Sequence, residues 1–156
     1  MVKEEIFMLR AIELSKISIN KGGGPFGCVI VKDNKIISEG YNQVTNNNDP
    51  TAHAEIVSIR KACQTMKTFN LSEVELYSSC EPCPMCLSAI YWARIKFIYF
   101  GNRKSDAAAI GFDDAHIYQQ IAMPEGQRSI PTNQMLSEEA IISFQKWTQS
   151  EFKIEY

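Results

Sequence analysis

Two short motifs, nearly thirty residues apart, place the strongest constraint on the fold of this chain. His53-Ala54-Glu55 opens a stretch of apolar residues with helical spacing, and Pro82-Cys83-Pro84-Met85-Cys86 follows a strand-like segment and opens a second helical stretch. Thiolate and imidazole groups are the ligands that Zn²⁺ prefers. If both motifs bind one ion, the fold has to bring two helix starts together.

The segments around these motifs alternate between helical and extended patterns. Cys83 and Cys86 lie at the start of a helix that separates two strands, so this strand, helix and strand form a crossover between parallel strands. Asp33-Asn34 marks the turn of a hairpin earlier in the chain. These patterns indicate an α/β fold. The spacing of apolar residues predicts helices over 4–19, 53–66 and 84–92, and strands over 26–31, 36–41, 74–79 and 96–101.

Beyond residue 101 the pattern predicts a short helix over 113–121, a short strand over 130–136 and a last helix from Ser137 to about residue 150. Thr51 is the expected N-cap of the helix that begins near His53. A length of 156 residues suits one domain that buries its own core. We therefore expect a single domain over 1–156.

Composition and charge narrow the class of protein. Hydrophobic residues make up 45% of the chain and charged residues 22%, as in ordinary globular proteins. The sequence shows no secretory signal, and its five cysteines are an odd number that suits free thiols in a reducing compartment. A cytoplasmic location is therefore expected, without a membrane partner. The net charge of −2 does not favour a nucleic-acid partner.

The ligand spacing indicates a catalytic zinc site. Cys83 and Cys86 are three residues apart at a helix start, and His53 supplies a third ligand. Three protein ligands leave the fourth tetrahedral position open to water, as catalytic zinc sites do. Glu55 projects roughly 200° around the helix from His53, which suits a proton shuttle better than a further ligand.

Two other readings of nearby residues stay open. Cys80 lies three residues before Cys83, so that Cys80, Cys83, Cys86 and His53 could form a closed structural zinc site. His116 follows two aspartates and could belong to a second metal or acid-base site, although a solvated surface histidine is the simpler reading.

At these residues the chain resembles the cytidine deaminase superfamily and, within it, the bacterial guanine deaminases, along nearly its whole length. The resemblance implies a three-layer α/β/α fold with a five-stranded mixed sheet, one Zn²⁺ per subunit, and hydrolytic deamination of guanine to xanthine and ammonia. It rests on Gly24-Pro25-Phe26-Gly27, Asn42, Asp49-Pro50-Thr51-Ala52-His53-Ala54-Glu55, Ser79-Cys80-Glu81-Pro82-Cys83-Pro84-Met85-Cys86, Gly111-Phe112-Asp113-Asp114 and Glu155-Tyr156.

The resemblance also implies roles for residues outside the metal motifs. Asn42 would hydrogen-bond the purine, and Asp114 would contact the purine edge and help in proton transfer. Tyr156 would close the pocket from a C-terminal segment exchanged between the two subunits of a homodimer.

A flat purine base also needs apolar walls. Phe26, Tyr91 and Trp92 are the aromatic candidates for those walls, and the backbone N–H of Ala54 is a candidate contact to the ring.

The main rivals share the metal motifs. A tRNA adenosine deaminase would be expected to carry a basic C-terminal segment, which 147–156 is not. A cytosine deaminase would have a smaller pocket with no need of Asp114. A zinc-stabilised binding module would not need Glu55.

Overall fold

A four-stranded mixed sheet forms the centre of the computed structural model, which describes residues 2–112 and 114–156. Its strand order is β2-β1-β3-β4. β1 (Gly27–Lys32) is antiparallel to β2 (Lys35–Tyr41) and to β3 (Glu75–Cys80), whereas β4 (Phe97–Asn102) is parallel to β3. The predicted crossover is confirmed, but the described chain has four strands in the sheet instead of five.

The β1–β2 hairpin turns at the pair that the sequence indicates. Asp33 and Asn34 have φ values of 49° and 61°. Two successive positive φ values are typical of the turn whose twist matches that of the flanking strands, and Asn and Asp tolerate them better than most residues. This turn pairs Lys32 with Lys35 and Val31 with Ile36, and a bulge between Ile30 and Val31 shifts the register of the remaining pairs.

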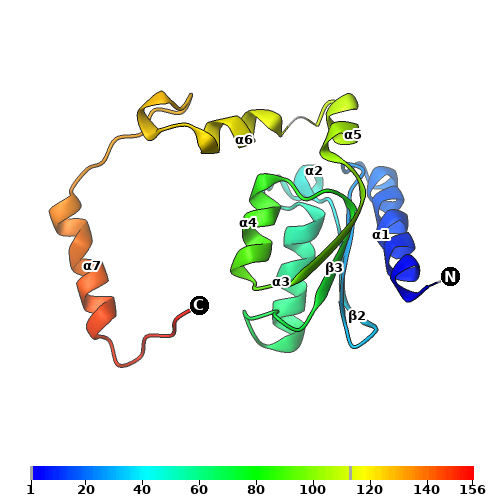
Figure 1. The fold of residues 1–156 in the computed structure, drawn as a ribbon, viewed down its shortest axis with the longest axis horizontal. Helices are drawn as coiled ribbons and strands as arrows, with labels where there is room; N and C mark the ends of the chain where they lie inside the picture. The colour runs from blue at the N-terminus through cyan, green and yellow to red at the C-terminus, as the bar shows by residue number, and fades with distance from the viewer. Residues whose placement is uncertain (1, 113) are drawn as a thin grey trace. The chain divides into compact units, whose positions relative to one another are not determined.

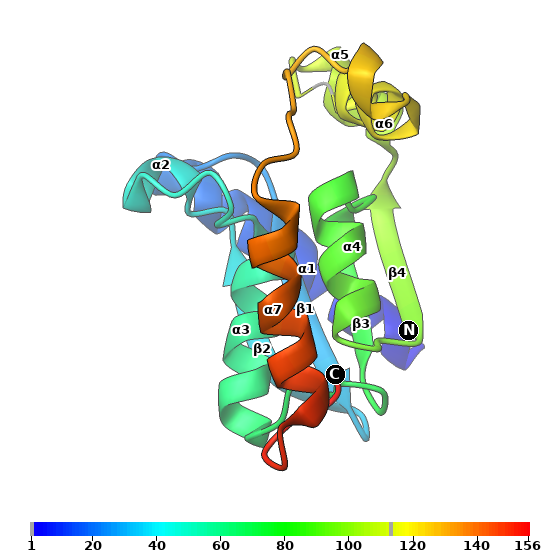
Figure 2. The ribbon, with the colours of Figure 1, turned by 90° about the vertical axis from the view of Figure 1, so that its left-hand side faces the viewer.

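Helices cover both faces of the sheet and make three layers (Figures 1 and 2). α1 (Lys3–Asn20) lies on one face, and α3 (Ala54–Met66) and α4 (Pro84–Trp92) lie on the other. Because side chains alternate along a strand, β1 serves both layers. Val29 and Val31 pack with the residues of α1, whereas Cys28 and Ile30 pack on the side of α3 and α4.

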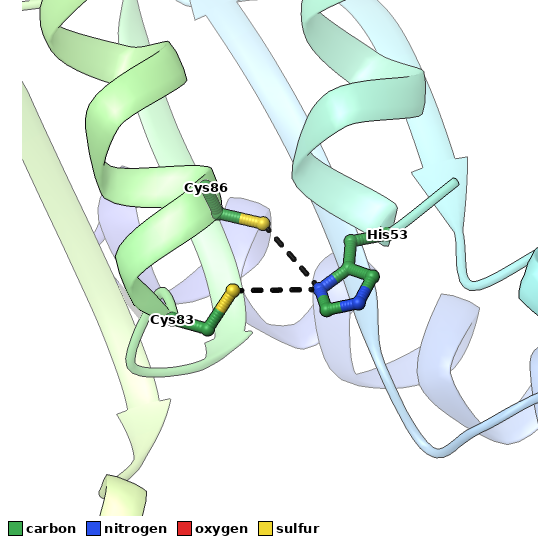
Figure 3. A group of neighbouring side chains, drawn as sticks. All are labelled: His53, Cys83 and Cys86. Atoms are coloured by element: carbon green, nitrogen blue, oxygen red, sulfur yellow. Dashed lines mark hydrogen bonds between the residues drawn. The ribbon is translucent and has the colours of Figure 1, made fainter. Parts of the chain in front are cut away.

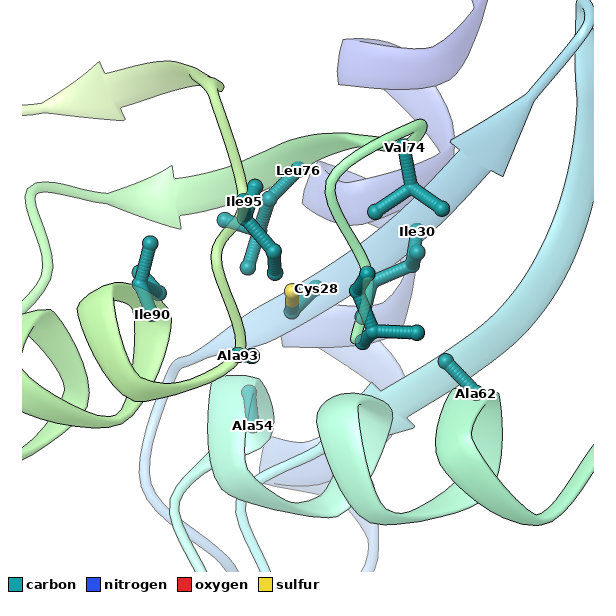
Figure 4. Close-up of a cluster of buried hydrophobic side chains, with 10 residues drawn as sticks. Cys28, Ile30, Ala54, Ala62, Val74, Leu76, Ile90, Ala93 and Ile95 are labelled. Atoms are coloured by element: carbon teal, nitrogen blue, oxygen red, sulfur yellow. The ribbon is translucent and has the colours of Figure 1, made fainter. Parts of the chain in front are cut away.

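The core on the α3 and α4 side ties both helices to the sheet (Figure 4). Ala54 in α3 and Ile90 in α4 are almost fully buried there, together with Leu76 of β3. Burying a leucine or isoleucine side chain contributes about 1.5–3 kcal/mol. The helix starts that carry the two motifs are therefore fixed on the sheet.

The sequence predicted Thr51 as the N-cap of α3, and this prediction is wrong. Its backbone N–H and hydroxyl both donate to the Asp49 carboxylate, at 2.8 and 2.7 Å, so its side chain is held in the preceding turn. His53 has the extended backbone of an N-cap residue, and its carbonyl accepts the first helical bond from Val57. Two short helices were also not predicted, α2 (Val44–Asn47) and α5 (Lys104–Ala109).

The chain divides into two compact units, residues 1–114 and residues 115–156. The second unit holds α6 (Ala115–Ala122), a 3₁₀ turn (Glu125–Gln127) and α7 (Ser137–Gln149), so both predicted helices are present. Asp113, the expected first residue of α6, lies outside the described residues. None of the described helices is both long and apolar enough to cross a bilayer.

The predicted strand over 130–136 is wrong. The segment is irregular and exposed, and no described strand pairs with it. Pro131 has no backbone N–H to donate to a neighbouring strand. Branched apolar residues alone do not make a strand, since a strand is stable only where a partner edge satisfies its backbone.

Candidate metal centre

The proposed zinc ligands come from two adjacent helix starts. His53 is the N-cap residue of α3, and Cys83 is the N-cap residue of α4. Pro84 occupies the first turn of α4, where its fixed φ suits a helix and its missing N–H costs nothing. Because α3 and α4 contact each other on the same face of the sheet, their starts bring the two motifs together.

The distances between these side chains fit one tetrahedral zinc ion (Figure 3). The Sγ atoms of Cys83 and Cys86 each lie 3.6 Å from His53 Nδ1, and all three ligand atoms lie within 4.8 Å of one another. Zinc–sulfur and zinc–nitrogen bonds of about 2.3 and 2.0 Å at a tetrahedral angle separate sulfur from nitrogen by about 3.5 Å. The group therefore fits a single Zn²⁺ in both donor type and spacing.

The three ligand groups shift one another's pKa. Hydrogen bonding from Cys86 lowers the pKa of Cys83 to about 4, with His53 contributing, and the same bond raises the pKa of Cys86. The interaction with Cys83 raises the pKa of His53. A cation that binds here has to displace these protons, because it requires thiolates and a neutral imidazole.

Glu55 lies beside the ligand group without belonging to it. Its side chain is 5% exposed, and Oε1 accepts a hydrogen bond of 2.9 Å from the hydroxyl of Ser78. Oε2 lies 3.4 Å from Cys86 Sγ. Burial raises the pKa of this carboxyl, partly offset by hydrogen bonds from its own backbone N–H, Ser78 and Cys86. A raised pKa suits a group that takes up and returns protons near neutral pH.

Cys80 is not one of the grouped ligands. Among the described residues the metal-binding group consists of His53, Cys83 and Cys86, and Cys80 Sγ lies 3.7 Å from the carbonyl oxygen of Arg103. Burial raises its pKa to about 11, with the charge of Glu55 as the next cause. The described chain therefore presents three ligands, which leaves a fourth position for water, and not the four of a closed structural site.

Phe26 and Asn42 are joined at the loops before β1 and after β2. The Asn42 backbone N–H donates to the Phe26 carbonyl at 3.0 Å, and Asn42 is 5% exposed. The Phe26 ring makes an edge-to-face contact with Phe112, with ring centroids 5.0 Å apart. Two segments that carry the family resemblance therefore meet at Phe26.

The other predicted site residues are placed less directly. Asp114 is half-buried, and its charge contributes to the raised pKa of Cys80, after burial and the charge of Glu55. Trp92 is 62% exposed at the C-terminal end of α4, roughly 12 Å along the helix axis from its start. Tyr156 and the exposed His116 belong to the second unit.

Ser78 was missed by the sequence analysis. It is fully buried in β3 and contacts the Glu55 carboxylate directly. A hydroxyl in a strand buried on both faces is a usable signal, because a buried polar group needs a partner. The sequence alone does not reveal which partner it has, since Glu55 lies 23 residues away along the chain.

Residues 1–102 match the family model of the cytidine and deoxycytidylate deaminase zinc-binding region. That range contains the whole metal group, Glu55 and all four strands. The guanine deaminase of Bacillus subtilis is 50% identical over 156 residues, which cover 99% of this chain and 100% of that protein.

Solved structures agree with this similarity. The crystal structure of the Bacillus subtilis guanine deaminase superposes with a TM-score of 0.95 at 51% identity, over 97% of this chain and 98% of that chain. A guanine deaminase from Nitrosomonas europaea superposes with a TM-score of 0.66 at 31% identity, over 86% and 70%.

A tRNA-specific adenosine deaminase from Aquifex aeolicus is also similar, at 41% identity over 62% of this chain and 64% of that protein. The metal ligands, the layered sheet and these similarities agree, and the chain belongs to the cytidine and deoxycytidylate deaminase family.

Proposed function

We propose that this chain is a zinc-dependent guanine deaminase, which hydrolyses guanine to xanthine and ammonia. The observation that carries the proposal is the similarity to a guanine deaminase through the whole chain, including the second unit. The metal group alone does not decide the substrate, because the tRNA-specific adenosine deaminase from Aquifex aeolicus is similar to 62% of this chain.

The reaction adds water to C2 of guanine and releases the amino group as ammonia. Zn²⁺ held by His53, Cys83 and Cys86 would lower the pKa of a bound water from 15.7 toward about 7. Glu55 would take the proton of that water and deliver it to N3 of the ring, since its carboxyl is buried beside the ligand group.

Residues outside the metal group offer groups suited to reading guanine. Guanine has donors at N1–H and at its amino group, and acceptors at O6, N3 and N7. We assign Asn42 to the ring through its side-chain amide and Asp114 to the donor edge through its carboxylate. The backbone N–H of Ala54 is a third candidate, because the first N–H groups of α3 have no partner within the helix. Phe26 is the favoured apolar wall, since it contacts Phe112.

A comparison of four candidate substrates tests the substrate assignment. Purified protein is mixed with guanine, adenine, cytosine or an inosine-accepting tRNA stem-loop, and ammonia release is followed before and after chelation. We expect release from guanine alone, and its loss when the metal is removed. Activity on the tRNA only would replace the proposal with a tRNA deaminase, and silence on all four would favour a different aminated ring or a binding module.

The active form is proposed to be a homodimer with exchanged C-terminal segments. Several apolar side chains of α7 are exposed within the second unit. Phe144 is 71% exposed and Trp147 is 45% exposed. Covering such side chains with a second copy would be favourable. Light scattering should give twice the 17.7 kDa of one chain, and a monomeric mass would overturn the dimer.

A cytoplasmic location completes the proposal. All five cysteines are free thiols, two of them in the metal group. Free thiols are typical of a reducing compartment, which fits the cytoplasm. Cell fractionation would test this point.

A further inference from the structure

Ser78 makes a buried hydrogen bond to the carboxylate that the proposed reaction uses. Its Oγ donates to Glu55 Oε1 at 2.9 Å, and both side chains are buried. On β3, Leu76 and Ser78 point to the same face because side chains alternate along a strand. Leu76 packs in the core on the α3 and α4 side, so Ser78 faces the start of α3.

The backbone that carries Ser78 is held from both sides. β3 lies between β1 and β4, and the register pairs Ser78 with Cys28 on one side and with Phe100 on the other. A hydroxyl on a central strand is placed more precisely than one on a loop, which matters for a group that orients another. Ser78 is fully buried, so water does not compete for this bond.

Glu55 needs such a partner because the last torsion of a glutamate side chain is soft. Rotation about the bond to the carboxylate has broad minima, so burial alone does not decide where each oxygen points. Oε2 lies 3.4 Å from Cys86 Sγ, but a cysteine that ligates a metal has lost its proton and cannot donate. The Ser78 hydroxyl keeps its proton in either case.

We propose that Ser78 is a positioning residue, which anchors Oε1 of Glu55 so that Oε2 stays directed at the metal group and free to carry protons. The inference rests on the proposed function, since it concerns the proton shuttle of that reaction. It adds a residue that acts through Glu55 and does not itself contact the substrate.

Three variants test the role. Ser78→Ala removes the hydroxyl, Ser78→Thr keeps it, and Ser58→Ala is the matched control. Ser58 is also fully buried, but its hydroxyl donates to the Cys28 carbonyl at 3.1 Å and not to the site. For each zinc-loaded protein we would measure kcat and KM for guanine, zinc content and melting temperature.

We expect Ser78→Ala to lower kcat about 10- to 100-fold, with KM changed less than about threefold and zinc content unchanged. Ser78→Thr should recover most of the loss, and Ser58→Ala should keep the wild-type kcat. A Ser78→Ala enzyme with wild-type kcat would overturn the inference, as would equal losses of kcat in Ser78→Ala and Ser58→Ala.

Crystal structures of the zinc-loaded variants supply a readout that does not depend on the substrate. The Glu55 carboxylate should rotate or occupy two positions in Ser78→Ala and keep one position in Ser78→Thr. An unmoved, single carboxylate in Ser78→Ala would overturn the inference even if guanine proves not to be the substrate. Failure of the wild-type enzyme on guanine would instead count against the proposed function alone.

Discussion

Two glutamates of this chain show how surroundings decide what a carboxylate does. The Arg10 guanidinium lowers the pKa of Glu39, with Nε and a terminal nitrogen each 2.7 Å from its oxygens. Burial beside the metal ligands raises the pKa of Glu55. The first group stays charged in an ion pair between two elements, whereas the second has the raised pKa that the proposed proton shuttle needs.

Replacing Glu55 should separate proton transfer from metal binding. Glu55 lies outside the ligand group, so Glu55→Gln should retain zinc while kcat for guanine falls by about 10²- to 10⁴-fold, the usual range for losing a general acid-base group. Ammonia release and zinc content, measured on the same sample, check both parts. Glu13→Gln on the surface of α1 is the control. Loss of zinc, or activity near that of the wild type, would contradict the assigned role.

At the scale of elements, the salt bridge between Arg10 and Glu39 links α1 to β2 and should depend on pH. Because the folded pKa of Glu39 lies below its ordinary value, the pair stabilises the fold above about pH 4.3 and loses this contribution as the pH falls through the lower folded pKa. A double-mutant cycle of Arg10→Met and Glu39→Gln should give a coupling of about 1 kcal/mol at pH 7. The free energy of unfolding in denaturant measures it at each pH.

The same coupling should approach zero near pH 3, since a protonated Glu39 no longer attracts Arg10. Acid loss of zinc affects all four proteins of the cycle equally and cancels in the coupling. A coupling that stays constant between pH 7 and pH 3 would contradict this account.

The packing of α1 on β1 should be sensitive at Gly27. A Cβ built there would overlap the Ala11 carbonyl oxygen and lie 2.5 Å from the Ser15 nitrogen, both backbone atoms of α1. Gly27→Ala should therefore push α1 from the sheet and lower the free energy of unfolding by about 1–3 kcal/mol. Gly126→Ala is the matched control, because a Cβ at Gly126 would meet no atom within 4 Å. Equal melting temperatures for the two variants would refute this reading.

Local patterns predicted those elements whose stability is mostly local. The hairpin at Asp33-Asn34 and the helix start at Pro84 follow from residue types that suit particular backbone angles. The metal ligands were also predictable, because zinc restricts donor type and spacing. The segment 130–136 failed because a strand depends on a distant partner, and the bond from Ser78 to Glu55 was missed for the same reason.

At the scale of the whole molecule, the exposed apolar residues of the second unit raise the question of which surface they pack on. Ile141 and Ile142 of α7 are 47% and 46% exposed, and Phe144 is 71% exposed. A helix with this many exposed apolar side chains normally packs on another surface. Exchange of C-terminal segments between two copies would provide that surface and would make each active site depend on both chains.

A mixture of two inactive chains tests this dependence. Glu55→Gln keeps an intact Tyr156, and Tyr156→Ala keeps an intact Glu55. If the tails are exchanged, a hybrid dimer has one site with Glu55 from one chain and Tyr156 from the partner subunit, so coexpression should restore about a quarter of the wild-type sites. The control is coexpression of a Glu55→Gln chain with a His53→Ala chain. Both defects lie in the first unit, so no hybrid site is complete. Without exchange, neither mixture recovers ammonia release from guanine. A Tyr156→Ala chain that is fully active alone would instead remove Tyr156 from the site.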